Sequence, residues 1–304
     1  MRYVQPAPSL EVPVIALGCM RISNLSVKDV DKLIGTAVDS GVTFFDHADI
    51  YGGGKCEEVF GKALKASPGL REKIQLQSKC GIRKGQFDFS KEHILASVDG
   101  ILKRLDVEYI DTLLLHRPDA LMEPREVAEA FDQLEQAGKV RYFGVSNQNP
   151  WQMELLKQAV QQPLLFNQLQ FSAMFTGMVD AGLNVNMKID RSIDRDGGIL
   201  NYCQLQGVTV QAWSPFQYGF FEGVFVGNKK FPRLNKALDS LAEQYDATPS
   251  AIAAAWLLRY PVNMQVILGT TQPSRVKDIS RAADIRLNRK EWYQVYLAAG
   301  NELP

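Results

Sequence analysis

The chain has 304 residues, of which 46% are hydrophobic and 22% charged, an ordinary composition for a globular protein. Lysine and arginine together number 34, as do aspartate and glutamate, so no excess of positive charge points to nucleic acid or to an anionic membrane. The longest apolar run, residues 251–258, is too short to span a bilayer. Membrane-spanning, fibrous and disordered classes are therefore excluded, and we expect neither a nucleic-acid nor a membrane partner.

Four cysteines are scattered along the chain with no CxxC pair and no cysteine–histidine spacing suited to zinc: Cys19, Cys56, Cys80 and Cys203. They are typical of buried or free thiols in a reducing compartment. The first residues lack the charged and apolar regions of a secretory signal. The sequence therefore predicts a cytoplasmic protein with no disulfide framework and no metal site.

Short apolar runs of strand length alternate with helical windows along the chain. Gly41, Gly138 and Gly207 each follow a helical stretch and precede a strand, where a left-handed helix cap suits glycine. The runs predict strands at 14–20, 42–48, 74–80, 109–117, 140–147, 164–171, 208–215 and 265–269, and helices at 28–40, 92–105, 125–136, 151–159 and 232–245.

This alternation predicts a parallel sheet with right-handed crossovers, and eight strands suit a (β/α)₈ barrel. An open, doubly wound sheet is the alternative that periodicity leaves open. We expect one domain over residues 1–304. A long loop is predicted at 172–197, and an extra helix near 289–299 that packs on the barrel exterior or rims the pocket.

Polar residues at the ends of three consecutive predicted strands form the candidate active site, because the carboxyl ends of barrel strands carry the active site in such folds. Asp46 and Tyr51 follow the second strand, Lys79 ends the third, and His116 ends the fourth. A tyrosine can act as a general acid, an ammonium beside it lowers its pKa, and a carboxylate keeps that ammonium charged. An imidazole can hydrogen-bond a substrate oxygen.

Structural interpretations of the same residues stay open. Asp46 and Lys79 could form a buried ion pair, Tyr51 could cover a strand end, and His116 could be a core histidine. None of the four donates a hydride, so a redox reaction would need a cofactor.

The order and spacing of several motifs resemble the aldo-keto reductase superfamily across nearly the whole chain. These motifs are FFDHADIYG, SKCG, LLLHRPD, GKVRYFGVSN, FNQLQ, AWSP and ILGTTQPSRV. The resemblance implies a (β/α)₈ barrel that binds NAD(P)H without a Rossmann motif. It also implies a catalytic tetrad of Asp46, Tyr51, Lys79 and His116, in which Tyr51 protonates a carbonyl oxygen and His116 positions that oxygen.

The same resemblance implies the cofactor contacts. Ser146, Asn147 and Gln168 would bind the nicotinamide carboxamide, and Trp213 would stack on the ring. The adenosine and its 2′-phosphate would be held by Gly269, Thr270, Thr271, Gln272, Arg275 and Asp278, and further cofactor contacts fall on Gly18, Met20, Arg21, Asp46, Ser214 and Pro215. Thr270 and Arg275 favour NADPH over NADH.

The sequence departs from the common family pattern at His47, where many members have threonine, and at Leu268, where many have proline. Neighbouring strand residues point to opposite faces, so His47 should not replace Asp46. We expect an NADPH-dependent reductase that converts an aldehyde or ketone to an alcohol. Two alternatives remain: a cofactor-binding regulatory subunit with little turnover, and an aldolase that uses Lys79 as a Schiff-base nucleophile.

Overall fold

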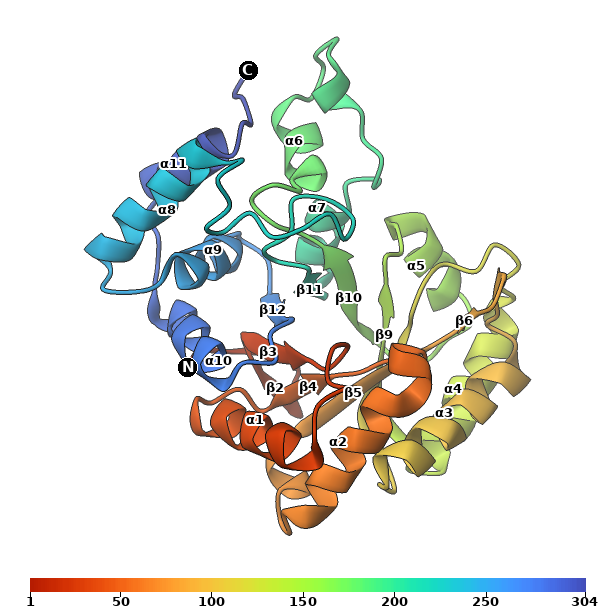
Figure 1. Ribbon diagram of the computed structural model, residues 1–304. Coiled ribbons are helices and arrows are strands. Elements are labelled where there is room, and N and C mark those ends of the chain that lie inside the picture. The colour runs from red at the N-terminus through yellow and green to blue at the C-terminus, as the bar shows by residue number, and fades with distance from the viewer.

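Eight parallel strands close into a barrel in the computed structural model, which describes residues 1–304 (Figure 1). Going around the barrel, the strands follow chain order, and the last of them pairs with the first. This closure confirms the predicted (β/α)₈ barrel and excludes the open sheet. The barrel strands are β3 (Ile15–Gly18), β4 (Phe44–Asp46), β5 (Gln75–Cys80), β8 (Ile110–Leu115), β9 (Val140–Ser146), β10 (Leu164–Gln170), β11 (Thr209–Trp213) and β12 (Met264–Leu268).

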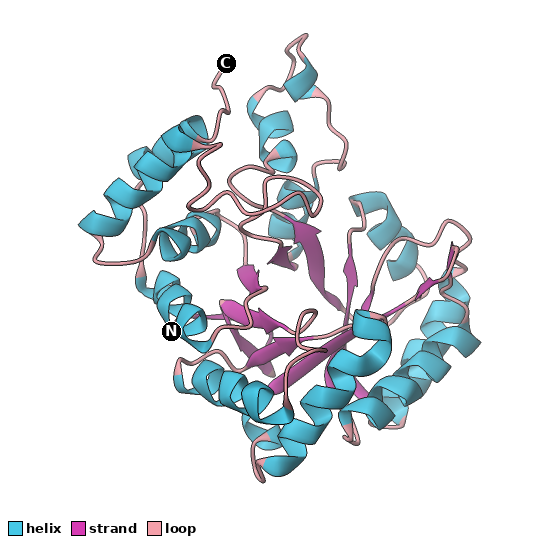
Figure 2. Cartoon of the chain, viewed as in Figure 1, coloured by secondary structure: helices cyan, strands magenta, loops and turns pink.

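Helices surround the strands, and at least one helix follows each barrel strand (Figure 2). A core of 74 buried residues fills the layer between strands and helices. The helices are α1 (Val27–Asp39), α2 (Lys55–Ala66), α3 (Lys91–Leu105), α4 (Pro124–Gln136), α5 (Pro150–Lys157), α6 (Gly177–Leu183), α7 (Ile199–Gln206), α8 (Pro232–Gln244), α9 (Pro249–Leu258), α10 (Pro273–Ser280) and α11 (Arg289–Ala298). None of them combines the length and the apolar character needed to cross a membrane.

Local sequence explains where α1 begins and ends. The Ser26 side chain accepts a hydrogen bond from the Asp29 backbone N–H and so satisfies a free donor of the first turn. Val30, Leu33, Ile34 and Ala37 recur on one face and are buried against the barrel. Gly41, with φ of 77°, then turns the chain toward β4.

A hairpin of β1 (Tyr3–Ala7) and β2 (Leu10–Pro13) closes the amino-terminal end of the barrel. Leu10 and Val12 are buried in a small apolar cluster with inward-facing strand residues such as Phe44 and Leu114. Gln75, at the start of β5, donates to the Glu11 carbonyl oxygen at 2.8 Å. This hairpin is not among the elements predicted from the sequence.

The seam of the barrel lies between β12 and β3. Ile267 and Leu268 are in register with Ala16 and Leu17. Gln265 Nε2 also donates to the Pro13 carbonyl oxygen at 2.7 Å, a contact between residues 252 positions apart.

The predicted long loop at 172–197 is wrong in part, because it contains α6 and a 3-10 turn, η3 (Asp190–Ser192). Only Val179 of α6 is buried, so the segment lacks the apolar repeat by which helices are predicted. The helix at the carboxyl terminus, α11, packs on α8 and α9 on the outside of the barrel. Trp292 of α11 stacks on Trp256 of α9, with ring centroids 4.8 Å apart.

Candidate active site

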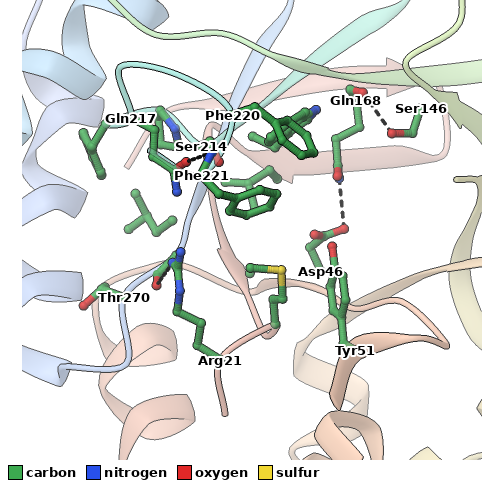
Figure 3. Close-up of a pocket in the computed structure, with 18 of the residues that line it drawn as sticks. Arg21, Asp46, Tyr51, Ser146, Gln168, Ser214, Gln217, Phe220, Phe221 and Thr270 are labelled. Carbon is green, nitrogen blue, oxygen red and sulfur yellow. Dashed lines mark hydrogen bonds between the residues drawn. The ribbon is translucent and has the colours of Figure 1, made fainter. Parts of the chain in front are cut away.

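A cavity of about 660 Å³ opens at the carboxyl-terminal ends of the strands (Figure 3). Most of the predicted site residues line it: Gly18, Met20, Arg21, Asp46, Tyr51, His116, Ser146, Asn147, Gln168, Trp213, Ser214, Pro215, Gly269, Thr270 and Arg275. Lys79 lies behind this wall and contacts Asp46 and Tyr51. Thr271, Gln272 and Asp278 lie outside the cavity wall.

Lys79 connects two of the predicted catalytic side chains. Its Nζ lies 2.9 Å from the Asp46 carboxylate and 3.1 Å from the Tyr51 hydroxyl oxygen, and it donates to the His47 carbonyl oxygen at 2.7 Å. The Lys79 side chain is fully buried and that of Asp46 is 3% exposed. The Tyr51 ring meets the His116 ring edge-on, with centroids 6.0 Å apart. The structure therefore brings all four side chains together.

Three glycines position Tyr51. Tyr51 is the first residue of a 3-10 turn, η1 (Tyr51–Gly54), and the three glycines of this turn have φ of 58°, 65° and 93°. Residues other than glycine rarely adopt this left-handed backbone conformation. The turn reverses the chain between β4 and α2 and leaves Tyr51 on the cavity wall.

Burial controls the ionisation of these groups. Burial raises the pKa of Tyr51 above its ordinary value, although the Lys79 ammonium acts in the opposite direction. Lys79 does lower the phenol pKa, as expected, but desolvation outweighs this contribution, so the net pKa of Tyr51 is raised. Burial alone would lower the pKa of Lys79, but Asp46 and Tyr51 raise it above its ordinary value, so the ammonium stays charged.

His116 is a neutral imidazole at neutral pH. Burial, and then the charges of Lys79 and Arg117, hold the pKa of His116 well below its ordinary value. Its Nδ1 is buried and has no hydrogen-bond partner in the protein. A neutral ring can still donate one N–H to an oxygen placed in the cavity.

A network of buried glutamines inside the barrel holds Asp46 in place, and this network was not predicted from the sequence. Gln77 Nε2 donates to Asp46 Oδ1 at 2.6 Å, and Gln168 Nε2 donates to the same oxygen at 3.0 Å. Gln211 Oε1 accepts from both glutamines, and its amide donates onward to Gln265. The barrel interior thus fixes the carboxylate that faces Lys79.

A second chain of hydrogen bonds links the ends of β9 and β11. Asn147 Nδ2 donates to Ser146 Oγ at 2.7 Å, and Trp213 Nε1 donates to Asn147 Oδ1 at 3.1 Å. Asn147 has φ of 57°, a conformation that asparagine tolerates better than most residues. These contacts fix the Trp213 ring at the edge of the cavity.

Cationic and hydroxyl groups gather at the end of β12, on the side of the cavity away from Tyr51 (Figure 3). Arg21 Nη1 donates to the Gly269 carbonyl oxygen at 3.0 Å. Thr270 Oγ1 accepts from the Gln272 backbone N–H at 3.1 Å, just before α10 begins. Arg275 lies in the first turn of that helix, where phosphate groups bind favourably.

The loop after β11 places two aromatic rings over the cavity, and these too were missed. Phe220 and Phe221 are 60% and 52% exposed and contact Trp213, with centroids 6.1 and 6.3 Å from its ring. Phe221 has φ of 59°, and its backbone N–H donates to the Gln217 side chain. A bulky residue in this conformation is strained, so the Gln217 bond helps to hold the loop.

Two polar residues at the end of β4 do not face the cavity. His47 lies edge-on against Phe60 of α2, as the alternation along the strand predicts, and burial lowers its pKa to about 3. Burial, together with the nearby Glu57 carboxylate, raises the pKa of Asp49 to about 7. Neither residue replaces Asp46.

Comparison with known proteins identifies relatives over the full chain. The model of the aldo/keto reductase family matches residues 14–296. The uncharacterized oxidoreductase YcsN of Bacillus subtilis is 37% identical, and a 6-dehydroglucose reductase of Agrobacterium fabrum is 34% identical; both alignments cover 100% of each chain. An aldo/keto reductase from Klebsiella pneumoniae, crystallised with NADP and acetate, superposes with a TM-score of 0.75 at 24% identity, over 94% of this chain and 90% of that one.

Proposed function

Because this chain belongs to the aldo/keto reductase family and is an oxidoreductase of that family, we propose that it uses NADPH to reduce an aldehyde or ketone to an alcohol. One observation carries the proposal: the Tyr51 hydroxyl faces the cavity while it lies 3.1 Å from a buried ammonium that is paired with Asp46. This arrangement suits a tyrosine that gives up a proton and needs charge stabilisation as it does so.

The residues around the cavity fit a phosphorylated dinucleotide. At about 660 Å³, the cavity has the size of a ligand pocket. Arg21, Thr270 and Arg275 supply two guanidinium groups and a hydroxyl for phosphates, and Trp213 offers an aromatic face to a planar ring. We assign the adenosine side to the end of β12 and the nicotinamide side to Ser146, Asn147, Gln168 and Trp213.

The preference for NADPH over NADH rests on Arg275 and Thr270. A 2′-phosphate is a dianion near neutral pH, and guanidinium groups bind phosphate oxygens through charge-assisted hydrogen bonds. Arg275 and Thr270 both line the cavity, and the Arg275 guanidinium forms no ion pair within the chain, while the Thr270 hydroxyl can still donate a hydrogen bond. The Klebsiella pneumoniae relative was crystallised with NADP, which agrees with this assignment.

When bound, NADPH supplies the hydride for the carbonyl carbon. The chain supplies the proton: Tyr51 keeps its hydroxyl proton at neutral pH because burial raises its pKa, and it passes that proton to the oxygen as negative charge develops there. The phenolate left behind is stabilised by Lys79, whose charge Asp46 maintains. Neutral His116 orients the oxygen by an N–H hydrogen bond.

The test compares Tyr51→Phe with the wild type on an aromatic aldehyde, a dicarbonyl, a quinone and a sugar aldehyde, with NADPH or NADH. Loss of the proton donor should lower turnover by about 10²- to 10⁴-fold, while quenching of tryptophan fluorescence still reports NADPH binding. Tyr142→Phe is the matched control, since the Tyr142 hydroxyl contacts Ser9 at the opposite end of the barrel.

Near-normal turnover in Tyr51→Phe would reject Tyr51 as the proton donor. A wild-type protein that binds NADPH but reduces none of the compounds would favour a regulatory, cofactor-binding subunit. Trapping of a substrate on Lys79 by borohydride would favour the aldolase alternative.

A further inference from the structure

We propose that Arg117 binds an anionic group on the substrate, so that the protein prefers carbonyl compounds that carry a carboxylate or a phosphate ester. The inference rests on the carbonyl reductase function proposed above and adds the substrate class to it. The shared chemistry is an oxyanion held by a guanidinium group next to the reacting carbonyl.

Arg117 lies at the reacting end of the cavity. It follows His116 directly after β8, and its half-buried side chain lines the cavity wall. Its guanidinium carbon lies 5.7 Å from the centre of the Trp213 ring. A group bound by Arg117 would therefore lie close to His116 and Trp213, where the carbonyl is expected to react.

No protein carboxylate neutralises this guanidinium, which forms no ion pair or hydrogen bond within the chain. The acid two positions along, Asp119, is already engaged: its two oxygens accept the backbone N–H groups of Phe89 and Leu121, each at 2.9 Å. The single acidic residue on the cavity wall, Asp46, is paired with Lys79. Burial lowers the pKa of Arg117, and Tyr51 offsets that desolvation only in part; a bound anion would offset it further.

The other two arginines on the wall, Arg21 and Arg275, lie at the β12 side, which we assign to the phosphates of the cofactor. Arg117 is thus the cation left for the substrate. The cavity wall also carries aromatic rings, Trp213, Phe220 and Phe221, of which Trp213 lies next to Arg117. An ion pair is stronger in such surroundings than in open water.

The experiment uses two pairs of substrates that differ mainly in charge. The first pair is 4-carboxybenzaldehyde and its methyl ester, and the second is glyceraldehyde 3-phosphate and glyceraldehyde. We expect the wild type to have a higher kcat/KM for the anionic member of at least one pair, and the pair concerned identifies carboxylate or phosphate as the preferred group.

Arg117→Gln should lower kcat/KM for the anionic member by about 10- to 100-fold, mainly through KM, and change that of the neutral member by less than about 3-fold. Arg117→Lys should recover part of the loss because it restores the charge without the guanidinium fork. Arg125→Gln, at the exposed start of α4, is the matched control and should behave as the wild type.

Equal efficiency on charged and neutral members in the wild type, or equal losses on both in Arg117→Gln, would overturn the anion site while leaving the reductase function intact. A higher kcat/KM for the neutral member than for the anionic member in both pairs would likewise overturn the anion site and indicate a site for uncharged substrates. Failure of the wild type to reduce all four compounds while NADPH is bound would overturn the proposed function, and the inference with it.

Discussion

Replacing Asp46 with asparagine should separate the electrostatic role of the carboxylate from its shape. In the wild type, Lys79 Nζ lies 2.9 Å from Asp46, and both side chains are shielded from water. An asparagine at this position can still accept the hydrogen bonds from Gln77 and Gln168, but it carries no charge opposite the ammonium. Breaking one side of a buried ion pair costs about 3–5 kcal/mol in the free energy of unfolding.

That loss is a large part of the total for a domain of ordinary stability, about 5–15 kcal/mol. The double variant Asp46→Asn/Lys79→Met removes the unpaired charge as well and should therefore be more stable than Asp46→Asn alone. We expect a coupling energy of about 2–3 kcal/mol between the two positions, measured by urea unfolding of the four proteins.

The pH dependence of unfolding gives an independent measure of the interaction between Asp46 and Lys79. Without Asp46, burial should bring the pKa of Lys79 below its value in the unfolded chain, so the unfolded state binds more protons and stability rises with pH in that window. The difference in free energy of unfolding between the wild type and Asp46→Asn should therefore become smaller from neutral to mildly alkaline pH, by at most about 1.4 kcal/mol per pH unit. Two results together would refute this account of the ion pair. The losses in unfolding free energy of the two single variants would add up to that of the double variant within about 0.5 kcal/mol, and the stability difference between the wild type and Asp46→Asn would not change with pH.

Two further predictions concern the backbone near the site and the cofactor. Gly81→Ala should destabilise the protein by about 1–3 kcal/mol more than Gly85→Ala, as measured by urea unfolding. Both glycines have positive φ (109° and 81°), but only at Gly81 would an added Cβ collide with the Phe89 ring. Equal losses of stability in the two variants would mean that the Phe89 ring moves aside freely. Arg275→Ala should raise the Kd of NADPH by about 10-fold and leave that of NADH nearly unchanged, as measured by fluorescence quenching, and a parallel loss for both cofactors would remove Arg275 from the 2′-phosphate site.

The barrel is predictable from sequence because its strands alternate with helices in which one face is apolar. Two of the helices that escaped prediction, α9 and α2, break that rule. All of α9 from Ala251 to Leu258 is buried, so its sequence has no polar face to mark a helical period. In α2 a charged residue, Glu57, is fully buried against Arg104 and Ser78, which interrupts the apolar pattern.

The predicted catalytic residues share one property, since each follows or ends a predicted strand, and the barrel brings such positions together. The supporting residues do not share it. Gln77 and Gln211 lie in mid-strand, and glutamine is usually exposed, so no pattern in the sequence identifies them as buried partners of Asp46. Phe220 and Phe221 reach the cavity only because of the path taken by a long loop, which strand and helix periodicity does not describe.

The seam between β3 and β12 has a consequence for synthesis of the protein. The strand that receives β12 is made first, yet its partner leaves the ribosome some 250 residues later, since Pro13 and Gln265 are 252 positions apart. At about 5–20 residues per second, the nascent chain spends roughly 10–50 s with an open sheet edge at β3. Open strand edges promote aggregation, and contacts between distant residues form slowly. The β1–β2 hairpin forms a separate two-stranded sheet and does not pair with β3, so that edge has no strand partner until β12 arrives.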